Sequence, residues 1–108
     1  MTIKTVIFPS DSELQIINEN AFDNSSISNI FIPRHVKKIC KNAFIRCKNL
    51  QSVEFAQDCE LQTIEENAFA LTTIKSLSIP SSVSNLSIGW CSGTPKLENI
   101  TIIRNEQE

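Results

Sequence analysis

Four cysteines and one histidine are the side chains of this sequence best suited to chemistry. The thiols belong to Cys40, Cys47, Cys59 and Cys91, and His35 is the sole imidazole. A structural zinc site usually draws on Cys-x-x-Cys pairs or on several histidines, and neither occurs. A cysteine nucleophile would need an imidazole aimed at it and an oxyanion hole, which no motif here provides. We therefore predict no metal, no cofactor and no catalytic activity, so this chain is predicted not to be an enzyme.

A run of positive charge is the second chemical feature. Between positions 34 and 48 there is no carboxylate, and the six basic residues are Arg34, Lys37, Lys38, Lys41, Arg46 and Lys48. Clustered cations attract acidic glycans or nucleic acids. The alternative is a solvated segment balanced by acidic neighbours such as Glu19, Glu65 and Glu66. We favour the second interpretation and predict no nucleic-acid partner, because no stacking aromatic residues accompany the run.

An internal repeat decides which elements must position these residues. Asn-Ala-Phe occurs at 20–22, 42–44 and 67–69. Shifting the sequence by 47 residues aligns 61 pairs of positions with 16 identities and no gap. A repeat of this kind is typical of solenoids, in which each unit buries its apolar face only against its neighbours.

Each half of the 47-residue unit contains one short alternating segment. These segments are Val6–Phe8, Ile30–Ile32, Val53–Phe55, Leu77–Ile79 and Ile100–Ile102. Alternation with period two predicts a β-strand, and the Ala-Phe turn that follows looks helical or 3₁₀. We expect the five strands to stack in parallel with their apolar residues inward, and Phe22, Phe44 and Phe69 to form a second internal column.

The same intervals resemble a known family. The segment Ile32-Pro33, Val36, Ile39, Ala43-Phe44, Cys47, Leu50, Val53 is similar to the unit of the BspA-like leucine-rich repeat. That resemblance implies a leucine-rich-repeat solenoid of about four and a half units, with parallel strands and short helical or 3₁₀ return turns. It also implies a surface antigen that adheres to host cells or matrix proteins. One departure is that the fourth unit has Gly89-Trp90-Cys91 in place of Asn-Ala-Phe, with Trp90 expected to fill the space of the missing phenylalanine.

Outward-facing strand positions are the predicted partner-binding surface. They would form an open strip along the sheet, and the candidate contact residues are Ile7, Phe31, Glu54, Ser78 and Thr101. Ile7 and Phe31 are apolar neighbours there, which predicts either an anchor for a protein partner or packing under a preceding repeat. Both interpretations stay open at this point.

The ends of the array bear on partners and location. Ile3 and Val6 at one end, and Ile100, Ile102 and Ile103 at the other, would be open apolar rungs that favour self-association or belong to a longer array. The sequence has no apolar run long enough to cross a membrane and no recognisable secretory signal. The family resemblance indicates a cell-surface or secreted adhesion module. The missing signal favours an intracellular scaffold or adaptor, so the location is left undecided.

Size and thiol state complete the expectations. The 108 residues allow one domain, which we place at 1–105, followed by a short acidic tail at 106–108. Cys47 occupies a repeat position that a small apolar group fills, so we interpret it as a buried reduced thiol. Cys40 and Cys47 are the pair to consider for a disulfide in an oxidising compartment.

Overall fold

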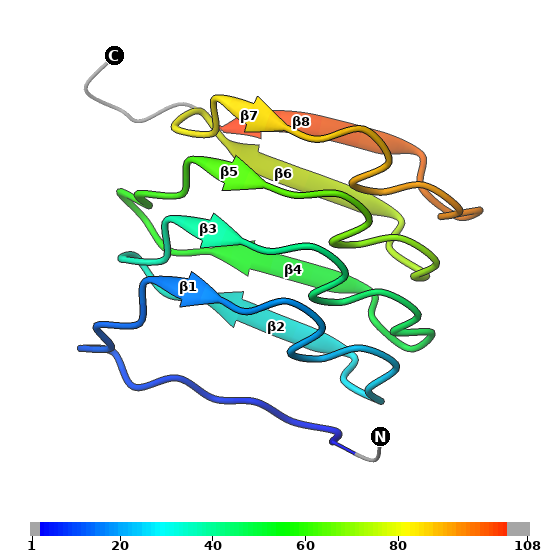
Figure 1. The fold of residues 1–108 in the computed structure, drawn as a ribbon, viewed down its shortest axis with the longest axis horizontal. Helices are drawn as coiled ribbons and strands as arrows, with labels where there is room; N and C mark the ends of the chain where they lie inside the picture. Colours follow the sequence, from blue (N-terminus) through cyan, green and yellow to red (C-terminus); the bar gives the residue numbers. More distant parts are fainter. Residues whose placement is uncertain (1–2, 104–108) are drawn as a thin grey trace.

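Two walls of short parallel strands enclose one continuous core (Figure 1). The computed structural model describes residues 3–103, so the predicted acidic tail at 106–108 lies outside the described residues. The strands are β1 (Ile16–Ile17), β2 (Asn29–Ile32), β3 (Lys38–Ile39), β4 (Ser52–Phe55), β5 (Thr63–Ile64), β6 (Ser76–Pro80), β7 (Asn85–Leu86) and β8 (Asn99–Ile103).

The chain winds through about four turns of a solenoid. The odd-numbered strands form one four-stranded sheet in the order β1-β3-β5-β7, and the even-numbered strands form two pairs, β2-β4 and β6-β8. All pairings are parallel, as the predicted leucine-rich-repeat solenoid requires. The sequence did not lead us to expect the odd-numbered sheet, which makes the return path a second wall of strands.

The core consists of the same repeat positions in successive rungs. On the even-numbered strands Ile30, Ile32, Val53, Leu77 and Ile79 are buried, as the alternation predicted. The odd-numbered strands contribute Ile17, Ile39 and Ile64 from the opposite side. Full burial of one such side chain stabilises the fold by roughly 1.5–3 kcal/mol, so these ladders provide much of the driving force.

The phenylalanine column is present as predicted. The rings of Phe22 and Phe44 stack with centroids 5.3 Å apart, and those of Phe44 and Phe69 stack at 5.1 Å. Beyond Phe69, the Trp90 carbonyl accepts from the Phe69 amide just as the Ala68 carbonyl accepts from Phe44. Trp90 therefore occupies the alanine position of this turn, its side chain is partly buried against the core, and its filling of the phenylalanine space stays a prediction.

The return turns are not helical, which corrects the sequence prediction. Asn20, Asn42, Asn67 and Gly89 all have positive φ, between 58° and 77°. A second left-handed residue follows four positions later in each turn, at Asn24, Arg46, Leu71 and Gly93. A left-handed residue interrupts a right-handed helix, and asparagine and glycine tolerate that conformation best. The Asn of each Asn-Ala-Phe motif thus takes the left-handed backbone conformation that the turn requires.

Hydrogen bonds in these turns alternate between two directions. Phe22 donates its amide to the Ala43 carbonyl of the next rung, whereas the flanking Ala21 donates to Asn18 three residues back. The pattern repeats from rung to rung. Alternate backbone amides therefore donate to a carbonyl of the same turn and to a carbonyl of the next rung. Stacked β-turns satisfy the backbone here without a helix.

The first predicted strand, Val6–Phe8, has no strand pairing, which corrects the prediction. This segment runs extended below β2 (Figure 1), and the Ser26 amide bonds to the Ile3 carbonyl. Val6 and Phe8 are only partly buried, and both pack against the core. At the opposite end Ile100 and Ile102 are 50% and 57% exposed, although the repeat places them at core positions.

One interruption divides the even-numbered wall. Within residues 3–103, no backbone ladder joins β4 to β6, although the two strands lie next to each other. Gln51 donates to Ser28 and Glu98 donates to Lys75, but the corresponding bond at this step is missing. The Thr73 hydroxyl donates instead to the Leu50 carbonyl at 2.9 Å.

Candidate protein-binding surface

Four outward-facing residues lie on the even-numbered strands, and Ile7 lies on the unpaired extended segment that precedes β1. We call these five residues, Ile7, Phe31, Glu54, Ser78 and Thr101, the outer strip. The register pairs Phe31 with Glu54 and Ser78 with Thr101. Because side chains alternate along a strand, the four strand residues face away from the core while their neighbours point inward. The structure thus pairs Phe31 with Glu54 and Ser78 with Thr101 at outward-facing positions, and the use of all five residues as one contact surface stays a prediction.

The apolar end of the outer strip is open to solvent. Ile7 is 84% exposed and Phe31 is 49% exposed. Within the described part of the chain no preceding segment packs over them. Glu54 and Thr101 are also exposed, whereas Ser78 is half-buried. The strip therefore changes from apolar at one end to polar toward the other.

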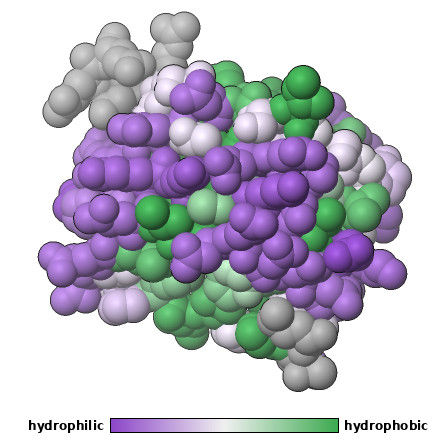
Figure 2. Space-filling view, in the orientation of Figure 1, coloured by the Kyte–Doolittle hydropathy of each residue, from purple (hydrophilic) through white to green (hydrophobic). Residues whose placement is uncertain are grey.

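The opposite wall bears a shallow charged hollow. In Figure 2, which views that wall, hydrophilic residues cover most of the surface, with smaller apolar patches between them. The hollow is lined by Glu19, Lys41, Glu65, Glu66, Leu86, Ser87 and Ile88. Glu19, Lys41 and Glu66 come from equivalent positions in successive rungs, so the row alternates in charge and leaves no single sign to attract a polyion.

Two residues of the basic run form ion pairs with acidic side chains of neighbouring rungs. Lys38 lies 3.4 Å from Glu65, and Arg46 lies 3.2 Å from Asp23. Burial acts to raise the pKa of Asp23, but hydrogen bonds from Arg46 and Asn20 outweigh it and hold that pKa below the usual value. These ion pairs support the interpretation of a solvated, charge-compensated segment. Being exposed, each contributes little to stability.

The thiols are embedded to different depths. Cys47 is fully buried, as expected, and its thiol donates to the Phe22 carbonyl at 3.0 Å while the Ser25 hydroxyl lies 3.3 Å from the sulfur. Burial raises the pKa of the Cys47 thiol, opposed by the hydrogen bond from Ser25. Cys40 and Cys47 are both free thiols.

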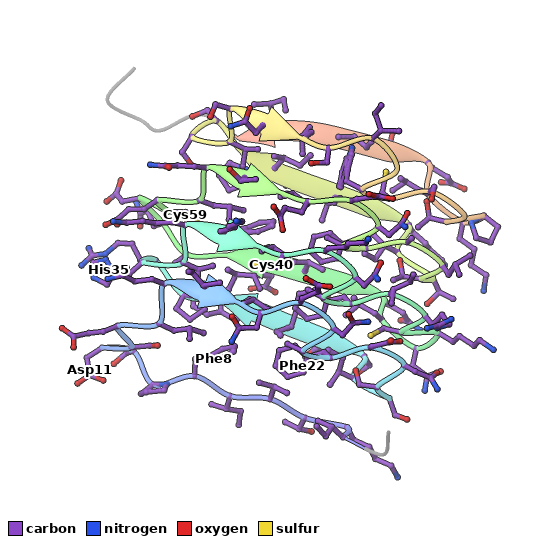
Figure 3. All side chains as sticks on the ribbon, viewed as in Figure 1. Phe8, Asp11, Phe22, His35, Cys40 and Cys59 are labelled. Carbon is purple, nitrogen blue, oxygen red and sulfur yellow. The ribbon has the colours of Figure 1, made fainter. Side chains whose placement is uncertain are left out.

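The single histidine contacts a carboxylate, and the thiols labelled in Figure 3 lie at different places in the fold. Figure 3 shows His35 and Cys59 near one edge of the molecule and Cys40 closer to the middle. The His35 ring nitrogen Nδ1 contacts the Glu60 carboxylate at 3.0 Å. Among residues 3–103, no group of three His, Cys, Asp or Glu side chains is placed to hold a metal ion. That same part of the chain contains no helix of the length and apolarity needed to cross a bilayer.

The sequence reasoning overlooked the apolar residues at the end of the odd-numbered sheet. Leu86 is 45% exposed, although Ile39 and Ile64 at the same repeat position are fully buried. Ile88 is 94% exposed at a position where the other rungs carry charge. The alignment of Ile17, Ile39, Ile64 and Leu86 at steps of 22, 25 and 22 residues was the available signal.

A coil of short parallel strands with a repeated apolar ladder is the architecture of a solenoid repeat protein. A family model, the BspA type leucine rich repeat region, matches residues 1–108 with six copies. The chain therefore belongs to the BspA-type leucine-rich repeat family. No curated protein matches the sequence significantly.

Two solved structures share this fold. The pneumococcal vaccine antigen PcpA superposes with a TM-score of 0.91 at 29% sequence identity, over 94% of this chain and 25% of that one. A leucine-rich repeat protein from Bacteroides capillosus superposes with a TM-score of 0.74 at 28% identity, over 83% of this chain and 64% of that one. The chain thus spans about a quarter of the length of the first and under two thirds of the second.

Proposed function

We propose that this repeat module binds a protein partner through the outer strip and serves in adhesion at a cell surface. The observation that carries the proposal is the exposure of the apolar side chains of Ile7 and Phe31, with Glu54 next to Phe31 in the register of β2 and β4. Exposed aromatic and aliphatic side chains in a fixed frame are typical binding anchors. The resemblance to a pneumococcal vaccine antigen supports the cell-surface part of the proposal.

Rigid display is the proposed mechanism. Strands in one ladder hold neighbouring side chains roughly 4.8 Å apart, so the strip needs no ordering of a loop before it binds. Ile7 and Phe31 would enter an apolar depression of the partner. Glu54 favours a basic group next to that depression, because opposite charges at an interface raise specificity and association rate.

Binding to purified matrix glycoproteins such as fibronectin, laminin and collagen tests the proposal. We expect Ile7→Ser and Phe31→Ala each to weaken binding about tenfold or more, the scale of an interface hot spot. Ile88→Ser is the matched control, since Ile88 is 94% exposed but lies on the other wall, and it should bind like the parent chain.

Stability measurements and cell treatment separate the remaining explanations. A large loss of thermal stability in Phe31→Ala would identify that residue as structural and contradict the proposal. Binding that is unchanged in both strip variants but lost in Ile88→Ser would move the contact to the opposite wall. Protease treatment of intact cells should remove the protein if it acts at the surface, whereas full protection would contradict adhesion.

A further inference from the structure

The step from β4 to β6, in the middle of the stack, differs from the steps on either side of it. We call this step the seam. Backbone ladders join β2 to β4 and β6 to β8, whereas no ladder joins β4 to β6 in the part of the chain that the structure describes. The two strands lie next to each other, so the ladder is missing although a neighbouring strand is present.

A proline accounts for one of the missing bonds. At the end of β4, the Ala56 amide donates to the Ile32 carbonyl of the preceding rung. The repeat places residue 80 in the equivalent position one rung further on, where an amide would point at the Phe55 carbonyl. Residue 80 is a proline, which has no N–H to donate. β6 therefore turns toward β4 the kind of strand edge on which proline is tolerated.

The proline recurs with the 47-residue repeat. Pro33 follows β2 and Pro80 ends β6, whereas alanine stands at the equivalent place after β4. Rungs of one type therefore lack this amide, and rungs of the other type have it. The seam thus follows from the repeat itself and not from a local irregularity of one turn.

Side-chain hydroxyls bridge the seam at both ends of β6. Before β6, the Thr73 hydroxyl donates to the Leu50 carbonyl at 2.9 Å. After β6, the Ser82 hydroxyl donates to the Leu61 carbonyl at 2.7 Å. Both bonds cross from the rung of β6 to the rung of β4, so the two rungs are connected here through rotatable side chains.

Backbone amides make these connections at the step from β2 to β4. Gln51 donates to Ser28 before β4, and Glu60 donates to Arg34 after it. A hydroxyl turns about its side-chain bonds and can keep its hydrogen bond when the carbonyl shifts slightly. A ladder of backbone amides fixes both strands at once. The seam is therefore the more deformable step.

The rest of the same rung boundary is continuous. On the odd-numbered wall β3 pairs with β5, and the Glu65 amide donates to the Ile39 carbonyl at 2.9 Å. In the turns the Phe44 amide donates to the Ala68 carbonyl at 2.7 Å, and the rings of Phe44 and Phe69 stack at 5.1 Å. Only the even-numbered side is weakly connected, so a displacement there pivots about the odd-numbered wall and the turns.

We propose that the seam is a hinge, along which the even-numbered wall opens between β4 and β6 while the odd-numbered wall and the turns stay bonded. β2 and β4 then move as one body, and β6 and β8 move as the other (Figure 1). Opening changes the distance between Glu54 and Ser78, but it leaves each of them at a fixed spacing from its own ladder partner. The hinge belongs to the frame that carries the outer strip and does not depend on which partner binds there.

Hydrogen exchange of the native full chain, followed by NMR, tests the hinge. Glu54 and Ser78 occupy equivalent places, and both amides point to the preceding rung, that of Glu54 across a ladder and that of Ser78 across the seam. Ser78 is the less exposed residue, so burial alone would protect it better. We expect the Ser78 amide to exchange at least tenfold faster than that of Glu54 after correction for residue type. One hydrogen bond is worth roughly two- to thirteenfold in a local opening equilibrium, and a ladder has several.

Two reciprocal substitutions make the test specific to the seam. Pro80→Ala supplies an amide opposite the Phe55 carbonyl and should slow exchange at Ser78 by roughly two- to thirteenfold, the effect of one hydrogen bond. Ala56→Pro is the matched control, because it removes the equivalent amide from the step that has a ladder, and it should speed exchange at Glu54 by a similar factor. Each substitution should leave the amide at the other step unchanged, which separates a local effect from a general loss of stability.

Three results would overturn the hinge. Equal exchange of Ser78 and Glu54 in the parent chain would do so without any variant. Exchange of the Glu65 amide at the same rate as Ser78 would mean that the whole rung boundary separates and does not pivot. A folded Pro80→Ala chain in which Ser78 exchanges as fast as before would show that the missing amide does not weaken the seam.

Discussion

Replacing Phe44 by leucine isolates the contribution of ring stacking to the stability of the solenoid. Phe44 is fully buried and its ring stacks on Phe22 and on Phe69 at 5.3 and 5.1 Å. Leucine retains most of the apolar area, so the loss is chiefly that of two aromatic contacts worth ~0.5–1.5 kcal/mol each. We expect Phe44→Leu to lower the free energy of unfolding by about 1–3 kcal/mol, and Phe22→Leu, with one contact, by about half as much.

Urea unfolding followed by circular dichroism measures these losses, and double-mutant cycles separate the contacts. The coupling between Phe22→Leu and Phe44→Leu should be ~0.5–1.5 kcal/mol. The coupling between Phe22→Leu and Phe69→Leu should be near zero, because Phe44 lies between the two rings. Equal coupling in both cycles, or a loss at Phe22 as large as that at Phe44, would refute the view that each rung is stabilised only by its immediate neighbours.

Two further variants address the turns and the thiols. Gly93→Ala should lower the melting temperature and reduce the free energy of unfolding by roughly 1–3 kcal/mol, because Gly93 has φ +67° and a Cβ there would approach Leu71 Cδ2 to 2.5 Å. Gly89→Asn places at position 89 the residue that the other turns carry, so it should reduce the free energy of unfolding by less. A larger loss for Gly89→Asn than for Gly93→Ala would contradict the turn assignment. Burial raises the pKa of Cys47 and Cys59, so the unfolded chain ionises first and stability should fall as pH rises through the ordinary thiol pKa. Cys59→Ser should lessen that alkaline fall in urea titrations, and an unchanged fall would count against the burial of Cys59.

The sequence was sufficient to predict the ladders of the even-numbered wall and the phenylalanine column. In both cases apolar residues recur at fixed intervals, and only a stack of equivalent rungs buries them all. The outer strip followed from the same alternation, because Phe31 and Glu54 lie between inward-facing neighbours. Whether a strand residue faces inward or outward depends on its immediate neighbours along the chain, so the sequence alone predicts it.

Other features depended on backbone geometry that the residue types do not specify alone. The Ala-Phe turn was expected to be helical, yet Asn42 and Arg46 both take left-handed φ values. Asparagine permits that conformation without requiring it, and arginine gives no hint of it. The odd-numbered strands are two residues long, too short for a period to be recognised. Residues 5–8 have the alternation of a strand but no ladder, since pairing requires a neighbouring backbone in register.

The interruption between β4 and β6 changes how the outer strip should be regarded. Phe31 and Glu54 belong to one ladder, and Ser78 and Thr101 belong to another. Within each pair, backbone hydrogen bonds fix the spacing of the two side chains. The two pairs are joined to each other by packing of β4 against β6 and by the hydrogen bond from the Thr73 hydroxyl. If the outer strip binds a partner as proposed, a ligand that spans all four residues would contact two separate hydrogen-bonded ladders, whereas a short ligand would contact only one.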